Sequence, residues 1–339
     1  MEFLKNLRKN TIVLLIITFL VLFFVLKDDF SDIVDTLLRM NTWYIFMALL
    51  AIFVYLFIKA YVSYISVNEK KKYSLLEAFK HTMIVQFFNG VTPFSTGGQP
   101  MEIYMLTEHD ISASRATSIV LQNFIFYQTA LVIFGIFAVV SNYFFRFFPK
   151  VPLLRQLVLL GFIINTLVLV LIFLVAYSEK FNRWCLKMIL KITNHFKKIK
   201  NRKERRLKWE TRIKEFNDCA KELSKRKMFF ITSVILNIIS LAFFYSIAYL
   251  IILGTPNVPS VTLVESIVAS AYVLIIGSFV PIPGASGGIE YGFLAFFGNF
   301  IPNKIVPAIL LMWRFITYYL PMIIGGIWFS FDRGDKKWE

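Results

Sequence analysis

Apolar residues fill long stretches of the chain, and charged residues gather between these stretches. A helix needs about 20 mostly apolar residues to cross the hydrocarbon core of a bilayer. Six stretches approach or exceed that length, and we interpret them as spanning helices: residues 11–26, 43–67, 116–141, 154–177, 228–253 and 305–329. The pattern predicts an all-α integral membrane protein, with residues 1–339 forming a single polytopic membrane domain.

The composition agrees with a membrane protein. Of the 339 residues, 57% are hydrophobic and 17% are aromatic, and the mean hydropathy is +0.65. These values exceed those of ordinary soluble domains. The first apolar stretch has the basic start of a signal peptide, but Lys27, Asp28 and Asp29 follow where a small-residue cleavage site would lie. We therefore expect it to be retained as an anchor.

The net charge of +16 comes mainly from two loops. Basic residues crowd into residues 197–206, and Lys70, Lys71 and Lys72 form a smaller group. The positive-inside rule assigns both loops and both chain termini to the cytoplasm, and the acidic residues 28–35 to the outside. Because topology accounts for the basic charge, we predict no nucleic-acid partner.

Residues 178–227 form a basic loop in which apolar side chains recur at helical spacing. The apolar positions are Phe181, Trp184, Cys185, Met188, Ile189, Ile192 and Phe196. Two interpretations remain open, and both can hold. The helix either lies on the anionic inner leaflet, which would then be a partner, or caps the helix bundle from the cytoplasmic side.

Two further apolar stretches, residues 74–106 and 262–300, are each interrupted by glycine and proline. Each begins with the four-residue pattern Ser/Thr-Leu-x-Glu, which is typical of a helix start with a hydroxyl cap. The same interval separates Glu77 from Pro93 and Glu265 from Pro281. A Gly-Gly pair and another glutamate follow in both. We interpret this match as an internal repeat, residues 43–141 and 228–329.

The number of crossings places the start of the first interrupted stretch at the cytoplasmic side and the start of the second outside. The repeats are therefore predicted to be inverted, with two broken, re-entrant helix hairpins that meet near the bilayer midplane. Whether residues 262–280 cross the membrane completely is left open at this point.

Non-helical backbone is costly in lipid, so it is found where protein buries it or where it lines a wet cavity. The half-helices that follow the loops, near Pro100 and Gly288, would point their N-terminal amides into such a cavity, which suits a phosphate or a carboxylate. The alternative is that these residues only kink helices or allow close packing.

Three ionisable residues fall in or beside apolar segments: Glu102, Glu290 and Arg314. A charge at the bilayer centre costs about 2.5–3.5 kcal/mol, so these side chains should be paired, protonated or wet. Arg314 is the strongest candidate for a phosphate contact, alone or in alternation with Glu290. Arg115 is expected to reach the interface. A polar set can line the cavity or bond between helices: Gln86, Asn89, Gln122, Asn123, Tyr127 and Gln128.

Motifs of soluble enzymes are poorly represented in the sequence. Cys185 and Cys219 form no CxxC pair, and His81, His109 and His195 form no zinc-binding pair. The chain also carries no Walker A lysine. We predict no cofactor and no metal.

Three motifs resemble the transmembrane region of lysylphosphatidylglycerol synthase, the flippase-like membrane domain of the multiple peptide resistance factor. They are "FFNGVTPFSTGGQPMEIYML" at 87–106, "VPIPGASGGIEYGFLAFF" at 280–297 and "MWRFITYYLPMIIGG" at 312–326. The commoner form of the first motif has Gly-Glu followed by an arginine. This sequence resembles the variant that has Gly-Gly-Gln-Pro in that place. The resemblance implies lipid handling in the plasma membrane of a prokaryote. The cytosolic transferase domain of the best-known members is absent from this sequence.

The resulting hypothesis is a lipid translocase that moves a lipid with an anionic or zwitterionic headgroup, such as phosphatidylglycerol or its lysyl form, between leaflets. The alternatives are a membrane-embedded transferase of the phosphatidylglycerol lysyltransferase or glycosyltransferase type, with Glu290 as general base, and a partner subunit. Whether the protein forms a homo-oligomer is left open. The predicted substrate-binding residues are Asn89, Pro93, Gly97, Gly98, Gln99, Glu102, Pro281, Pro283, Gly284, Gly287, Gly288, Glu290, Arg314 and Tyr318.

Overall fold

The computed structural model describes residues 30–67, 73–149, 151–178 and 226–334, with a few isolated positions between 178 and 226. In these residues the fold is entirely helical, which confirms the predicted class. Five helical stretches are long and apolar enough to cross a membrane: Thr42–Val67, Ala113–Phe145, Pro152–Leu174, Lys227–Gly254 and Val306–Phe331. They match five of the six predicted spans. The sixth, residues 11–26, and most of the basic loop 178–227 lie outside the described residues.

The five spans are built from seven labelled elements. Four spans are α3 (Thr42–Val67), α6 (Ala113–Phe145), α7 (Pro152–Tyr177) and α10 (Lys227–Gly254). The last span joins α13 (Val306–Arg314), the π-helical turn η3 (Phe315–Tyr319) and α14 (Leu320–Gly334). The sequence predicted this last span as one uninterrupted helix, so the π-helical turn is a correction.

Both interrupted stretches fold as a helix, a 3₁₀ turn and a second short helix. The first comprises α4 (Leu75–Val91), η1 (Pro93–Ser95) and α5 (Gly98–Thr107). The second comprises α11 (Leu263–Gly277), η2 (Pro283–Ala285) and α12 (Gly288–Phe297). The 15 residues of α11 extend about 22 Å at 1.5 Å per residue, which is short of a hydrocarbon core of about 30 Å. Helix α11 is therefore too short to cross the membrane alone.

The first helix of each hairpin begins with the capping box that the sequence predicted. The Ser74 hydroxyl accepts a hydrogen bond from the Glu77 backbone N–H at 3.2 Å, and the Glu77 carboxylate accepts one from the Ser74 N–H at 2.6 Å. Thr262 and Glu265 repeat this exchange at 3.2 and 2.7 Å. These reciprocal bonds satisfy amides that would otherwise have no partner at the helix start.

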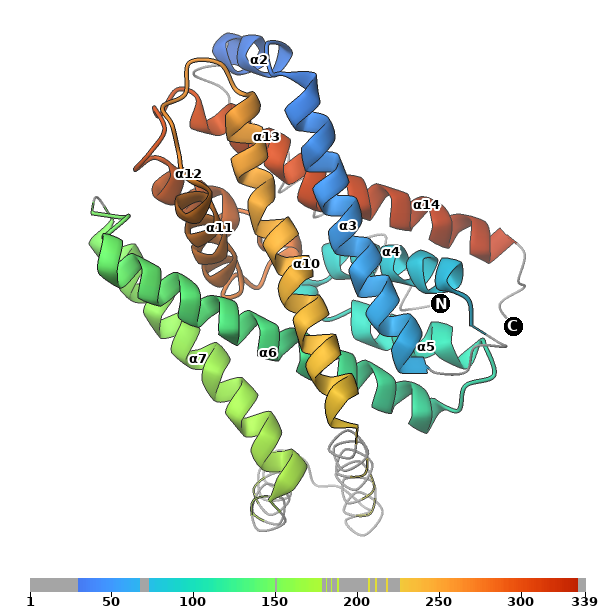
Figure 1. Cartoon of the computed structure of the whole chain (residues 1–339). Helices are drawn as coiled ribbons and strands as arrows, with labels where there is room; N and C mark the ends of the chain where they lie inside the picture. Colours follow the sequence, from blue (N-terminus) through green and yellow to red (C-terminus); the bar gives the residue numbers. More distant parts are fainter. Residues whose placement is uncertain are drawn as a thin grey trace, which may run out of the picture.

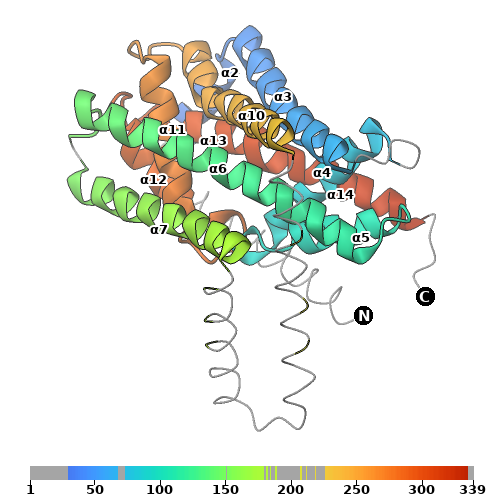
Figure 2. The ribbon, with the colours of Figure 1, turned by 60° about the horizontal axis from the view of Figure 1, so that its bottom comes forward.

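The two hairpins approach each other across the centre of the bundle. Helices α3 and α10 pack along one another, and Figure 1 shows the α4–α5 hairpin and the α11–α12 hairpin on opposite sides of α10. Their turns, η1 and η2, are in contact, and α14 packs along α4. Helices α6 and α7 lie side by side in Figure 2. The irregular backbone of both hairpins thus meets inside a frame of long helices.

The structure corrects the alignment of the two repeats. Thr92 and Ile282 both have φ −113° and ψ 143°, and each precedes a turn whose second residue is left-handed, Phe94 or Gly284. Pro93 is therefore equivalent to Pro283, whereas the sequence spacing had matched it to Pro281. The later glutamates are not equivalent either, because Glu102 is the fifth residue of α5 and Glu290 is the third residue of α12.

A short helix, α2 (Phe30–Leu38), occupies the acidic segment that the sequence analysis treated as a loop. Its Ile33 side chain is buried, and the helix packs against α13. Asp35 forms an exposed ion pair with Arg39 at 2.8 Å. The periodic apolar positions of this segment, and not its charge, determine its structure.

Candidate functional site

A buried ion pair joins the second hairpin to the last spanning helix. Glu290 lies in the first turn of α12, and Arg314 is the last residue of α13. Oε1 of Glu290 lies 2.7 Å from Nε and 2.6 Å from Nη2 of Arg314. The two residues are 4% and 2% exposed. This pair, in which one carboxylate oxygen contacts two guanidinium nitrogens, joins the two charges that the sequence placed in apolar surroundings.

Each member of the pair makes a further bond to the backbone of the loop. The other carboxylate oxygen of Glu290 accepts the Gly287 N–H at 2.6 Å, and Arg314 donates to the Gly284 carbonyl at 2.9 Å. The charge and several donors of Arg314 are therefore engaged by the protein. A phosphate could take over the Nε contact only if Glu290 moved away from Arg314, which is the predicted alternation of phosphate and Glu290.

Tyr318 connects the second half of the site to the first hairpin. Its hydroxyl donates to the Gly90 carbonyl in α4 at 2.9 Å, and its ring centroid lies 4.9 Å from the Arg314 guanidinium carbon. Tyr318 belongs to the π-helical turn that follows Arg314. Pro321, soon after this turn, lacks the N–H of a regular helix, and π-helical turns are frequent at functional sites.

The start of the first short helix is closed by side chains of its own hairpin. The Gly97 N–H donates to Thr92 Oγ1 at 2.9 Å, and the Gly98 N–H donates to Asn89 Oδ1 at 3.0 Å. A Cβ on Gly98 would collide with the Asn89 amide. In this conformation these two amides, like that of Gly287, already have partners within the protein.

Two cavities lie next to the hairpin turns. The first, of about 410 Å³, lies between the hairpins and is lined by Asn89, Gly284, Arg314 and Tyr318 among others. The second, of about 620 Å³, lies between α3, α4, α5 and α6 and is lined by Asn89, Gln99 and Glu102 among others. The two cavities share part of their lining: Gln86, Asn89, Phe94, Ser95 and Tyr127. The first hairpin turn thus stands between them.

The other predicted site residues support the loops and do not line either of these two cavities. They are Pro93, Gly97, Gly98, Pro281, Pro283, Gly287, Gly288 and Glu290. A Cβ on Gly288 would collide with Val280, which lines the first cavity. The structure thus separates a set of lining side chains from a set that holds the backbone in shape.

The predicted polar set serves both of the roles that the sequence left open. Gln86, Asn89, Asn123 and Tyr127 line a cavity, while Gln128 donates to Asn165 Oδ1 of α7 at 3.0 Å. Asn123 also accepts from Ser66 of α3 at 2.7 Å. Gln122 is buried, and Arg115 lies in the first turn of α6.

Two histidines meet at the end of the first hairpin that lies away from its turn. The rings of His81 and His109 lie 5.0 Å apart, Tyr73 hydrogen-bonds to His81 at 3.2 Å, and Nε2 of His109 lies 3.2 Å from Glu77. Partial burial opposes ionisation of Glu77, but hydrogen bonds from Ser74 and His109 outweigh it and lower the pKa of this carboxyl. No group of three or more candidate metal ligands occurs in the described part of the chain.

Comparison with known proteins identifies the family. The family model described as the lysylphosphatidylglycerol synthase TM region matches residues 10–325. The chain belongs to this family. A relative from Archaeoglobus fulgidus, a UPF0104 membrane protein, is 26% identical over an alignment of 274 residues that covers 78% of each chain. Membership in the lysylphosphatidylglycerol synthase TM-region family supports a membrane-lipid-related function.

In this member of the lysylphosphatidylglycerol synthase TM-region family, the sequence analysis missed one intramembrane charge, Lys59. It is the only charged residue of α3, and it lines the second cavity. An ionisable residue within an otherwise apolar span is by itself a signal of function, so the sequence alone offered this signal.

Proposed function

We propose that the protein is a lipid translocase, which moves a lipid with a phosphate-bearing headgroup, such as phosphatidylglycerol or its lysyl form, between the two leaflets. The headgroup would travel through the polar cavities beside the hairpin turns while the acyl chains stay in the surrounding lipid. The proposal also places the protein in a prokaryotic plasma membrane with both termini in the cytoplasm, as the distribution of basic residues favours.

The observation that carries this proposal is the contact between η1 and η2. Two interrupted hairpins that meet inside a bundle of spanning helices are typical of transporters, in which unwound backbone lines the substrate path. Here the turns border two cavities whose linings share Asn89 and Ser95. A scaffold protein would have no need for such a costly arrangement.

A proposed mechanism follows from the ion pair. In the described conformation Glu290 neutralises Arg314. A phosphate that replaced this carboxylate would keep the guanidinium paired, so the positive charge would never be buried alone. Separation of the pair would release the Gly284 and Gly287 contacts of the second loop. Headgroup binding and loop movement would thereby be coupled.

The transferase alternative has less support. Its candidate general base, Glu290, is held by Arg314 through one oxygen and by the Gly287 N–H through the other. A general base must reach the proton that it removes, so Glu290 would have to leave Arg314 in a transferase as well. The sequence shows no motif that would bind a group donor, so we keep translocation as the proposed activity.

The proposal is tested with purified protein in vesicles that carry fluorescent phosphatidylglycerol in both leaflets. A membrane-impermeant reductant added outside bleaches only the outer leaflet of protein-free vesicles. We expect bleaching to continue beyond the outer-leaflet pool in the presence of the protein, and lipid recovered afterwards to have an unchanged mass. Bleaching that stops at the outer pool for every lipid would contradict translocation, and a lipid of altered mass would favour the transferase.

A further inference from the structure

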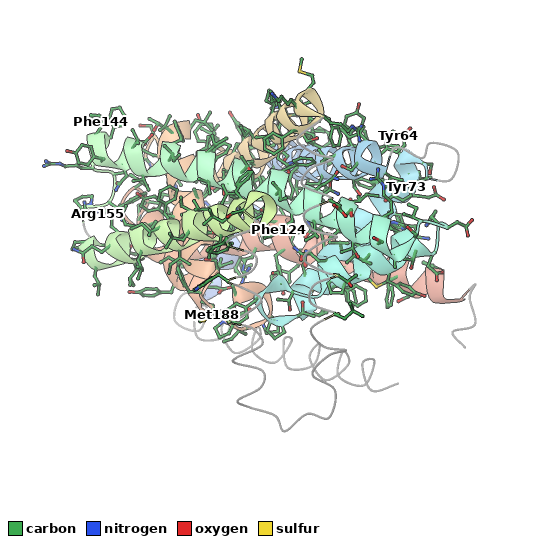
Figure 3. All side chains as sticks on the ribbon, turned by 90° about the horizontal axis from the view of Figure 1, so that it is seen from below. Tyr64, Tyr73, Phe124, Phe144, Arg155 and Met188 are labelled. Carbon is green, nitrogen blue, oxygen red and sulfur yellow. The ribbon has the colours of Figure 1, made fainter. Side chains whose placement is uncertain are left out.

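The second cavity has a built polar wall on α3. Tyr55, Lys59 and Ser63 recur at intervals of four residues and therefore lie on one face of the helix, and all three line the cavity. Further polar side chains from α4 and α6 also line it: Gln86, Asn89, Asn123 and Tyr127. In Figure 3, Phe124 of the same lining is labelled near the middle of the molecule.

Lys59 has donors that the protein leaves unused. Its ammonium donates one long hydrogen bond, 3.4 Å, to the Tyr55 hydroxyl, and it lies 5.3 and 4.9 Å from the ring centroids of Tyr55 and Tyr127. An ammonium has three donors. Within the described part of the chain, no carboxylate forms an ion pair with Lys59. This distinguishes Lys59 from Arg314, whose charge Glu290 matches at 2.6 Å.

Glu102 supplies an acceptor on the opposite wall. It is half-buried on α5 and accepts a hydrogen bond from Ser63 Oγ at 3.2 Å. Ser63 lies one helical turn beyond Lys59, and Lys59 and Glu102 line the same cavity. They form no direct pair, so a ligand can contact both groups.

The chemistry of the two side chains, Lys59 and Glu102, indicates the class of ligand. An anionic phosphate suits the ammonium, and hydrogen-bond donors such as an ammonium or hydroxyl groups suit the carboxylate. A phosphodiester headgroup with such donors at its far end carries both features. A volume of about 620 Å³ falls within the usual range of small-ligand pockets, about 300–1,000 Å³.

We propose that the cavity around Lys59 and Glu102 is a binding site for the headgroup of a phosphodiester lipid, in which Lys59 binds the phosphate and Glu102 binds amine or hydroxyl donors of the headgroup. This inference rests on the proposed function for its lipid ligand. The substrate class is phospholipids whose headgroups carry hydrogen-bond donors. The residue that binds the phosphate is Lys59 and not Arg314.

Binding is measured on the full chain in detergent, with dioctanoyl phosphatidylglycerol as ligand and dioctanoyl phosphatidylmethanol as a phosphodiester without headgroup donors. We expect Lys59→Met to weaken both at least tenfold and Lys59→Arg to restore binding to within about threefold, since arginine keeps the charge. Glu102→Gln should weaken phosphatidylglycerol but leave phosphatidylmethanol unchanged. Lys227→Met, at an exposed lysine that begins α10, is the matched control and should bind like wild type.

Equal binding by wild type and Lys59→Met overturns the site, and equal losses of both lipids in Glu102→Gln overturn the role of Glu102. Glycerophosphoglycerol, the headgroup without acyl chains, separates the sources of the phosphate: an affinity equal to that of the lipid overturns the lipid assignment. If Lys59→Met does not fold, Thr96→Trp is tested in its place, because Thr96 is exposed and lines the cavity. Unchanged lipid binding by Thr96→Trp also overturns the site.

The outcome is independent of the translocation assay. A wild-type protein that binds the lipid through Lys59 but does not translocate it would contradict the proposed function and leave the site standing. Normal translocation by the wild-type protein, together with unchanged lipid binding by Lys59→Met, would contradict the site and leave the proposed function standing.

Discussion

The buried pair Glu290–Arg314 illustrates what single residues contribute to this molecule. Both side chains are almost fully buried and hydrogen-bonded. A buried pair contributes little net stability compared with apolar residues, but removal of one partner leaves an uncompensated charge. Retention of the pair in a chain so rich in apolar residues therefore points to a functional role.

Removal of one or both partners separates stability from function. Arg314→Met should destabilise the protein by about 3–5 kcal/mol because it leaves Glu290 unpaired. Glu290→Gln combined with Arg314→Met should recover most of this loss, since glutamine still accepts the Gly287 N–H, yet translocation should stay abolished. Thermal unfolding in detergent and lipid translocation in vesicles measure the two effects. A stable double variant with wild-type translocation would show that the pair is only structural.

Single residues were predictable where a charge lay in an otherwise apolar segment. Glu290 lies in an interrupted stretch and Arg314 lies within the last apolar span, so the cost of a charge in lipid marked them directly. Lys59 carried the same signal, but nothing in the sequence of α3 indicates that Glu102 and Tyr127 line the same cavity. That convergence arises from tertiary packing, which the sequence does not display.

At the scale of elements, the two turns use the same backbone with different residues. Phe94 and Gly284 occupy equivalent left-handed positions, with φ values of 53° and 65°. A side chain is thus tolerated at this backbone position in η1. In η2 a Cβ at Gly284 would collide with the Tyr318 hydroxyl. The glycine is therefore explained by the close approach of Tyr318 rather than by the turn alone.

Gly284→Ala tests this explanation. We expect a loss of about 2–4 kcal/mol in the free energy of unfolding, from left-handed backbone strain and overpacking against Tyr318. Phe94→Ala, at the exposed equivalent position, should change stability by only about 0.5 kcal/mol. The cost of Gly284→Ala should shrink in a Tyr318→Ala background, which lacks the whole ring that the added Cβ would meet. Equal losses at both turns, measured by denaturant unfolding, would contradict the explanation.

The elements were predictable to different degrees. Capping boxes at Ser74 and Thr262 and the interruptions at glycine and proline follow from local backbone chemistry, so the two hairpins were anticipated. The equivalence of Pro93 with Pro283 was not, because Pro281 precedes Pro283 by only two residues and the spacing favoured the wrong proline. The π-helical turn before Pro321 depends on how the last span packs.

At the scale of the whole molecule, the order of elements occurs twice. A long helix, a broken hairpin and another long stretch follow one another from α3 to α6 and again from α10 to α14. Tyr318 bonds the second half to α4 of the first half at 2.9 Å. If the halves move against each other during translocation, this contact and the η1–η2 contact are among those that must change.

The most direct test of the central claim compares translocation by wild type and Ser95→Trp. Ser95 is exposed and lines both cavities, so a tryptophan there should obstruct the proposed headgroup path. Ser330→Trp, at an exposed position of α14 that lines neither cavity, is the matched control. We expect bleaching beyond the outer leaflet with wild type and Ser330→Trp and loss of it with folded Ser95→Trp. Equal translocation by all three proteins would contradict the account.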